Sequence, residues 1–136
     1  MRVVIDTNVL VSALLRELNS PPALTLEKVL KEDDCKLLLS PDLLAEYEEV
    51  LTRKKFAKAF HDKDIRALLA SLAAESIFII PFTEINDCED ADDNMVLALV
   101  IDGFADCIIS GDDHLLRLHP FKTIPILSPS DFLKMF

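Results

Sequence analysis

The chain has 136 residues, of which 51% are hydrophobic, and this is ample for the core of one compact domain over residues 1–136. No apolar run of about 18 residues or more is present, which argues against a transmembrane helix and a membrane partner. The start Met1–Asp6 meets an acid too soon for a signal peptide, so we expect a cytoplasmic protein. The net charge of −10 disfavours nucleic-acid binding at first sight, because polyanion binding rests on lysine and arginine.

In the first half of the chain, short apolar runs alternate with segments of helical periodicity. In chain order the sequence predicts a strand at residues 2–5, a helix at 9–15, a loop at 18–22, a helix at 23–30, a strand at 36–39, a helix from Ser40-Pro41 to Leu51, and a short helix at 56–60. Serine followed by proline is a typical helix start, since serine caps free amides and proline fits the first turn.

The second half continues the alternation. It predicts a helix at residues 63–74, a strand at 76–80, an acidic loop at 83–92, a helix at 93–101, a strand at 105–109, a short helix at 112–118, a strand at 123–127, and a last helix from Ser128-Pro129 to Phe136. The strand at 123–127 is expected at a sheet edge, because Pro125 lacks an amide donor. Strands that alternate with helices predict a parallel sheet covered on both faces.

Four acidic residues stand where an apolar run ends or a helix begins, and they are Asp6, Glu46, Asp93 and Asp112. Carboxylates at the carboxyl ends of parallel strands can meet in one crevice, where the strand order reverses. Like charges repel unless a cation lies between them, and hard oxygen ligands suit Mg²⁺ or Mn²⁺. A divalent ion that keeps some of its waters is the usual equipment for phosphodiester chemistry.

The first two acids have structural alternatives. Asp6 could simply cap the following helix, but one cap suffices and three polar residues are present in Asp6-Thr7-Asn8. Glu46 lies beside the apolar stripe of its helix, and an acid that faces inward needs a partner or a metal. The alternative for Glu46 is a partly solvated boundary position.

The third acidic cluster stands before a helix. Asp93 is in phase with the apolar residues of that helix and is expected to face inward. Asp90 and Asp92 either cap the helix or tune the site, since acids at a helix start are favoured by the helix dipole alone.

The fourth cluster follows the strand predicted at 105–109. Asp112 is the first residue after the Ser110-Gly111 turn, and Asp113 is the alternative ligand. Ser110 is placed to hydrogen-bond a carboxylate or a metal-bound water. His114 and His119 are five residues apart, which does not form a metal pair on one helix face, so we expect surface roles for both.

The cations and the cysteines carry weaker signals. A basic cluster, Arg53, Lys54, Lys55 and Lys58, is either a solvated helix face or a contact for a substrate backbone or an acidic partner. The cysteines Cys35, Cys88 and Cys107 are far apart and form no C-x-x-C motif, which favours reduced, mostly packed thiols.

Five short motifs follow one another along nearly the whole chain. They are VVIDTNVLVSAL at 3–14, SPDLLAE at 40–46, DADDNMVLA at 90–98, IISGD at 108–112 and IPILSP at 124–129. In this order they resemble the motifs of PIN-domain ribonucleases, a family that includes VapC-type toxins of toxin–antitoxin pairs. Each motif is weak alone, whereas the ordered set is specific.

The resemblance implies a three-layer α/β/α fold with a central five-stranded parallel sheet in the order 3-2-1-4-5. It also implies an acidic quartet that holds Mg²⁺ or Mn²⁺, together with supporting polar residues. Asp6, Glu46, Asp93 and Asp112 match the quartet, Thr7, Asn8 and Ser110 match the supporting positions, and we count Asp90 as a further supporting residue. One departure is visible, because the third motif often begins with Arg-Asp and here Cys88-Glu89 precede Asp90. This removes a cation near the site.

The function implied is that of a divalent-metal-dependent endoribonuclease, in which a metal-bound water attacks an RNA phosphodiester in line. The resemblance further implies an antitoxin protein as partner and a homodimer. Two rival interpretations remain. An inactive PIN-fold domain would bind RNA or protein without cutting, in keeping with the acidic charge. A receiver-like signalling domain would need a lysine at a late strand end, and none is found near residues 126–128.

Overall fold

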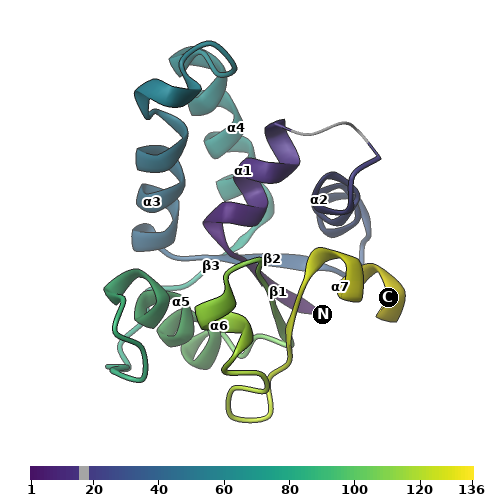
Figure 1. The fold of residues 1–136 in the computed structure, drawn as a ribbon, viewed down its shortest axis with the longest axis vertical. Coiled ribbons are helices and arrows are strands. Elements are labelled where there is room, and N and C mark those ends of the chain that lie inside the picture. Colours follow the sequence, from purple (N-terminus) through teal and green to yellow (C-terminus); the bar gives the residue numbers. More distant parts are fainter. Residues whose placement is uncertain (16–18) are drawn as a thin grey trace.

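The computed structural model describes residues 1–15 and 19–136 (Figure 1). In chain order the elements are β1 (Arg2–Ile5), α1 (Thr7–Leu15), α2 (Pro21–Lys31), β2 (Lys36–Leu39), α3 (Pro41–Leu51), the 3-10 helix η1 (Lys54–Phe56), α4 (Asp62–Glu75), β3 (Ile77–Phe78), α5 (Ala91–Asp102), β4 (Cys107–Ile109), α6 (Asp113–Leu116), β5 (Ile126–Leu127) and α7 (Pro129–Met135). Within the described ranges, no helix combines the length and the apolar character needed to cross a bilayer.

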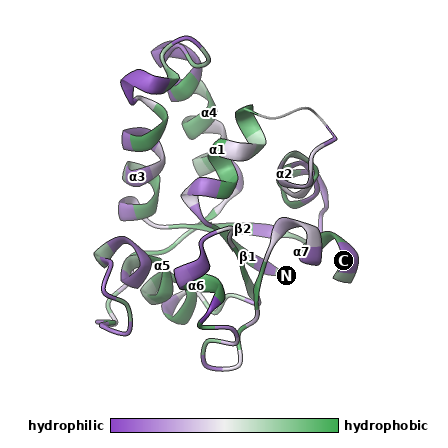
Figure 2. Cartoon of the chain, in the orientation of Figure 1, coloured by the Kyte–Doolittle hydropathy of each residue, from purple (hydrophilic) through white to green (hydrophobic). Residues whose placement is uncertain are grey.

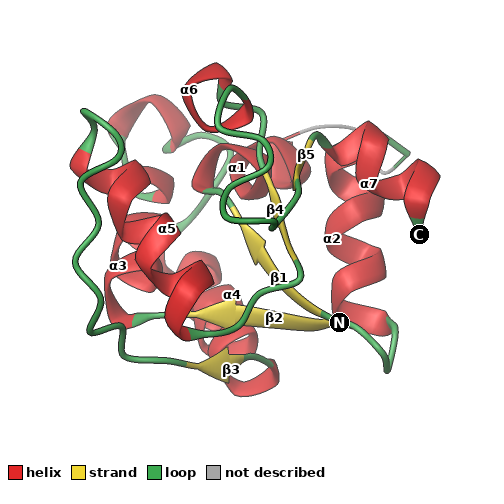
Figure 3. Ribbon diagram, turned by 90° about the horizontal axis from the view of Figure 1, so that it is seen from below, coloured by secondary structure: helices red, strands yellow, loops and turns green. Residues whose placement is uncertain are grey.

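The five strands form an all-parallel sheet in the order β3-β2-β1-β4-β5 (Figure 3). Ile5 of β1 is paired with Ile109 of β4, so the two central strands end level with each other. Figure 1 shows α1 to α4 on one side of the sheet and α5 and α6 on the other. The three-layer α/β/α fold and the predicted strand order are therefore confirmed. The strand order reverses between β1 and β4, which is where α/β folds usually bind ligands.

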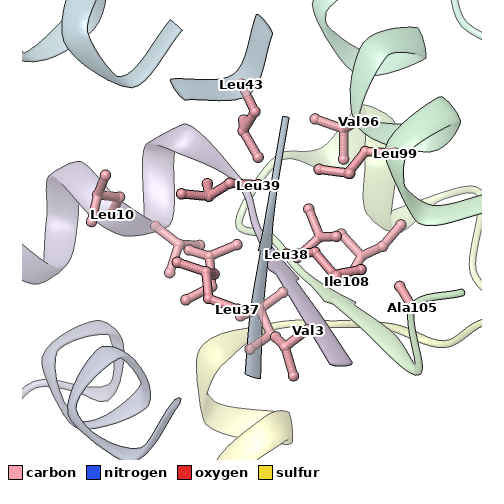
Figure 4. Close-up of a cluster of buried hydrophobic side chains, with 14 of the residues drawn as sticks. Val3, Leu10, Leu37, Leu38, Leu39, Leu43, Val96, Leu99, Ala105 and Ile108 are labelled. Atoms are coloured by element: carbon pink, nitrogen blue, oxygen red, sulfur yellow. The ribbon is translucent and has the colours of Figure 1, made fainter. Parts of the chain in front are cut away.

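The core is built from strands that are apolar on both faces. Figure 4 shows Leu39 of β2 beside Leu10 of α1 on one side of the strand, and Leu38 beside Ile108 on the other, facing Leu99 of α5. All five side chains are at most 1% exposed. Consecutive residues of a strand point to opposite faces, so a sheet covered on both sides needs an unbroken apolar run such as the one in β2.

Three helices begin with a capping serine followed by proline. Ser20, Ser40 and Ser128 each accept a hydrogen bond from the amide three residues ahead, at 3.4, 3.0 and 3.1 Å. At α2 this corrects the loop predicted over residues 18–22, because Pro21 and Pro22 form the first turn, where proline needs no amide partner. Leu18, which was assigned to the same loop, lies outside the described residues.

The two edge strands are shorter than the sequence predicts. β5 starts at Ile126 rather than at residue 123, because Lys122 and Thr123 have positive φ values of 46° and 72°, which no strand allows. β3 ends at Phe78 rather than at residue 80, because its neighbour β2 ends at Leu39. The Ile79 amide still donates to the Leu39 carbonyl, and β2 offers no backbone partner after that.

Two helices are displaced from their predicted positions. α5 starts at Ala91, two residues early, because the Asp90 side chain accepts the Asp92 amide at 2.9 Å and caps the helix. The short helix predicted at residues 56–60 is instead the 3-10 turn η1, which starts at Lys54.

Candidate functional site

The site lies at the point where the strand order reverses. Asp6 follows β1 and is only 6% exposed, and its amide donates to the Ile109 carbonyl at 2.9 Å, which continues the pairing of β1 with β4. Ser110, the residue after β4, donates its hydroxyl to Asp6 Oδ2 at 2.9 Å, and the Thr7 amide donates to Asp6 Oδ1 at the same distance. The two central strands thus hold the Asp6 carboxylate in one orientation.

Glu46 reaches the same region from α3. The buried hydroxyl of Thr7 donates to Glu46 Oε1 at 2.6 Å, across 39 positions of sequence. The other oxygen, Glu46 Oε2, is buried and has no hydrogen-bond partner among the described residues. Next to it, the Tyr47 hydroxyl donates to the Ile5 carbonyl at 2.5 Å, which ties α3 to the end of β1.

The remaining two acids stand at helix starts. Asp93 is in the first turn of α5 and is 6% exposed, so it faces inward as its phase predicted. Asp112 caps α6 by accepting the His114 amide at 3.0 Å, while its own amide donates to Ser110 Oγ at 2.9 Å. Ser110 therefore links Asp112 to Asp6 through its hydroxyl.

All four predicted acids line one pocket of about 180 Å³, together with Asn8 and Asp90. We call it the acidic pocket. Asp113, the alternative to Asp112, is exposed and does not line it. Thr7 and Ser110 lie behind the pocket and hold its carboxylates, whereas the exposed Asn8 faces into it.

The charges in the pocket are crowded. Burial raises the pKa of Asp6 from 3.8 to about 6, although its bonds from Ser110 and Thr7 oppose the rise, and the charges of Asp112 and Asp93 add to it. Burial likewise raises the pKa of Asp93 to about 6, helped by Asp112 and Asp90. The pKa of Glu46 is raised by burial as well, and Asp92 and Asp6 contribute. A carboxylate in such a setting is stabilised by a proton or by a cation.

The donor set fits a hard divalent cation, because every candidate ligand is a carboxylate oxygen and Glu46 Oε2 is buried without a partner. In residues 1–15 and 19–136, however, no three His, Cys, Asp or Glu side chains stand close enough together to form a ready-made metal site. Mutual repulsion explains this spacing, as do the hydrogen bonds that engage both oxygens of Asp6. The chemistry of the donors suits the ion, and the carboxylates would have to approach one another to hold it.

The sequence analysis missed one residue of the site and left the role of another open. Tyr47 is the chain's only tyrosine, and its position next to Glu46 and its need for a hydroxyl partner were usable signals. Arg53 belongs to the basic cluster, for which a substrate contact was one of two alternatives, and it lines the acidic pocket and pairs with Glu49 of α3. Arg53 supplies a cation near the site, whereas the third motif lacks the arginine that it often contains.

Asp92 also lines the acidic pocket, whereas the cysteines and the histidines do not. Cys35 and Cys107 are buried and Cys88 is half-buried, and all three are free thiols. His114 and His119 are exposed, and His119 Nδ1 accepts the Ile126 amide at 2.9 Å.

The comparison with known proteins assigns the family. Residues 2–114 match the PIN domain family, and the chain belongs to it. Over its full length the chain is 33% identical to the uncharacterized protein MJ1680 of Methanocaldococcus jannaschii, covering 92% of that protein. Its fold is similar to a chain in the crystal structure of VapBC2 from Rickettsia felis bound to a DNA fragment from their promoter. The TM-score is 0.63 and the identity 12%, over 94% of this chain and 98% of that one.

PIN domains are nucleases that generally use divalent metals, which supports a hydrolase acting on nucleic acid in general terms. The acidic pocket lies where such a function needs it, at the carboxyl ends of the two central strands.

Proposed function

We propose that this protein is a divalent-metal-dependent ribonuclease that cleaves RNA phosphodiesters, and that it is the toxin of a toxin–antitoxin pair in the cytoplasm. The observation that carries the proposal is the convergence of four carboxylates from four separate parts of the chain, Asp6, Glu46, Asp93 and Asp112, on one pocket of a PIN fold.

The quartet would hold one or two Mg²⁺ or Mn²⁺ ions, which supply an activated water and neutralise the charge that develops on the phosphate. The protein's own part is orientation. Ser110 and the Thr7 amide fix the two oxygens of Asp6, and the Thr7 hydroxyl fixes one oxygen of Glu46. Such supporting bonds keep ligand oxygens in a productive direction.

The test is a nuclease assay on mixed RNA, with Mg²⁺ or Mn²⁺ and with EDTA. We expect cleavage with metal and none with EDTA. Binding of RNA without cleavage would instead favour an inactive PIN-fold domain, the second candidate, which is supported by the absence of a ready-made metal site among the described residues. Cleavage that persists in EDTA would contradict the assignment of the quartet.

The partners follow from the family resemblance and are proposals too. An antitoxin would cover the acidic pocket with a peptide and stop cleavage, and two copies of the chain would form a homodimer. Analytical ultracentrifugation of the purified protein tests the homodimer, and a monomer at all concentrations would contradict it.

A further inference from the structure

The acidic pocket poses an electrostatic problem for a polyanionic substrate. Residues 67–116, which contain α5 and two of the four acids, include eleven aspartates or glutamates and no lysine or arginine. RNA that approaches this region meets repulsion that a metal in the pocket would offset only locally. Cations that attract the flanking phosphates must therefore come from outside this segment.

Arg53 borders the pocket on one flank. Arg53 lines the acidic pocket and lies two residues beyond the end of α3, the helix that carries Glu46 and Glu49. Glu49 Oε1 and Oε2 accept hydrogen bonds from Arg53 Nε and Nη2 at 3.1 and 2.9 Å, so the fork is held in a defined orientation. Lys54, Lys55 and Lys58 follow directly, and Figure 2 shows this end of α3 as strongly hydrophilic.

Arg117 is the second arginine close to the site. A second pocket, of about 540 Å³, adjoins the acidic pocket, because Asp90 and Asp93 line both. His114 and Arg117 line this second pocket and do not line the acidic pocket. Among the described residues Arg117 makes no ion pair, so its guanidinium is available to a ligand.

Because the two pockets share Asp90 and Asp93, we treat them as one acidic track that has one arginine in each of its two parts. Among the described residues, Arg53 and Arg117 are the only lysine or arginine side chains that line either pocket. Arginine is suited to phosphate because its planar fork donates two parallel hydrogen bonds to the phosphate oxygens.

We propose that Arg53 and Arg117 bind the phosphates on the two sides of the cleaved bond, so that single-stranded RNA crosses the acidic pocket from one arginine to the other. This assignment rests on the proposed function. The two residues bind substrate and take no part in the hydrolysis itself, so they set affinity and the direction of the strand.

The experiment compares Arg53→Ala and Arg117→Ala with Arg66→Ala, a matched control on the exposed face of α4 that lines neither pocket. Cleavage of a short fluorescein-labelled oligouridylate gives kcat and KM. Each site variant should raise KM about tenfold, the expected loss for one charge-assisted hydrogen bond. It should leave kcat nearly unchanged, because the lost contact stabilises the bound substrate and the transition state equally.

Binding is measured separately in an Asp6→Asn background with Mg²⁺, as a function of salt. Loss of one phosphate contact reduces the slope of log K against log salt by about 0.7 for a single strand. We expect this reduction for each site variant, about twice as much for the double variant, and none for Arg66→Ala.

The variant Glu49→Gln distinguishes a structural role of Arg53 from phosphate binding, because it breaks the ion pair and keeps the guanidinium. If Arg53 serves only its bond to Glu49, Glu49→Gln and Arg53→Ala behave alike. If Arg53 binds phosphate, Glu49→Gln binds RNA as well as the parent does, or better, because an acid has left the track.

The outcomes separate this inference from the proposed function. Cleavage by the wild type with unchanged KM and salt slope in both arginine variants would overturn the track and keep the nuclease. Binding that depends on both arginines without any cleavage would overturn the nuclease and keep the track. Absence of both binding and cleavage would overturn both.

Discussion

Asp6 is the residue on which the site depends most, since both of its oxygens are held by hydrogen bonds and it is almost fully buried. We predict that Asp6→Asn lowers metal-dependent cleavage at least about a hundredfold, because even residues that only support a metal ligand are worth 10- to 100-fold. The fold should survive, since asparagine has the same shape.

The control for this variant is Asp33→Asn, which removes one negative charge from an exposed loop far from the pocket. Circular dichroism checks the fold of both variants, and cleavage rates are compared at equal metal concentration. Equal activity of Asp6→Asn and the wild type would contradict the role of Asp6.

The raised pKa of Asp6 predicts how the metal-free protein responds to pH. Because the pKa is about 6 in the folded protein and 3.8 ordinarily, the folded state prefers the protonated acid. The stability that this preference contributes is fully present below about pH 4 and is lost as pH rises through about 6. It amounts to about 2–3 kcal/mol for Asp6.

The measurement is urea unfolding in EDTA at several pH values, for the wild type and for Asp6→Asn. Between pH 4 and about 6.5, the wild type should lose stability relative to the variant. At neutral pH, Asp6→Asn should therefore be the more stable protein without metal. A difference between the two that does not change with pH would show that Asp6 titrates normally.

At the scale of elements, Tyr47 connects α3 to the sheet. Tyr47→Phe removes the hydroxyl that donates to the Ile5 carbonyl and leaves that buried acceptor with one partner fewer. We expect a loss of about 1–2 kcal/mol in the free energy of unfolding. Cleavage should fall as well, because α3 carries Glu46.

Ser76→Ala is the matched control, since it removes a hydroxyl that donates to the Ala73 carbonyl, at the end of α4 and away from the pocket. It should leave cleavage unchanged. Unfolding is followed by far-UV circular dichroism, because the chain has one tyrosine and no tryptophan. If Tyr47→Phe is as stable and as active as the wild type, the hydroxyl does not hold α3.

The elements that could be predicted from the sequence are those with a local cause. Ser40-Pro41 and Ser128-Pro129 mark helix starts because cap and proline act within one turn, and both starts are confirmed. The start of α5 was placed two residues late, because which of several aspartates caps a helix depends on side-chain orientation. The ends of β3 and β5 depend on the neighbouring strands and on a turn at Lys122–Thr123, which leave little local signal.

The same distinction applies to the site. The inward phase of Asp93 follows from the period of its own helix, so it could be predicted. The bond from Thr7 to Glu46 and the place of Arg53 at the pocket join residues from different elements. No periodicity within one segment reports such contacts, and only the packed structure shows them.

At the scale of the whole molecule, charge is distributed very unevenly. The net charge is −10, and residues 67–116 alone hold eleven acids and no lysine or arginine. Arg2 partly compensates this segment, since its amide donates to Asp106 and its guanidinium donates to the Gly103 carbonyl. The metal-free protein should therefore be stabilised by any salt that screens repulsion, over a distance of about 8 Å at physiological ionic strength.

A specific ion in the acidic pocket adds a second effect, which a thermal-shift series can separate from screening. We compare MgCl₂ with NaCl at equal ionic strength. Binding to the folded state alone stabilises by about 2.7 kcal/mol at a hundredfold excess over Kd, which raises Tm by roughly 3–5 °C per kcal/mol for a domain of this size. The wild type should therefore melt at a higher temperature in MgCl₂ than in NaCl.

The variant Asp6→Asn separates the two effects. Its response to NaCl should remain and its extra response to MgCl₂ should shrink, because only the response to MgCl₂ needs converging carboxylates. An equal response of the wild type to both salts would mean that its acids act as a diffuse charge, and that the pocket has no preference for a divalent ion.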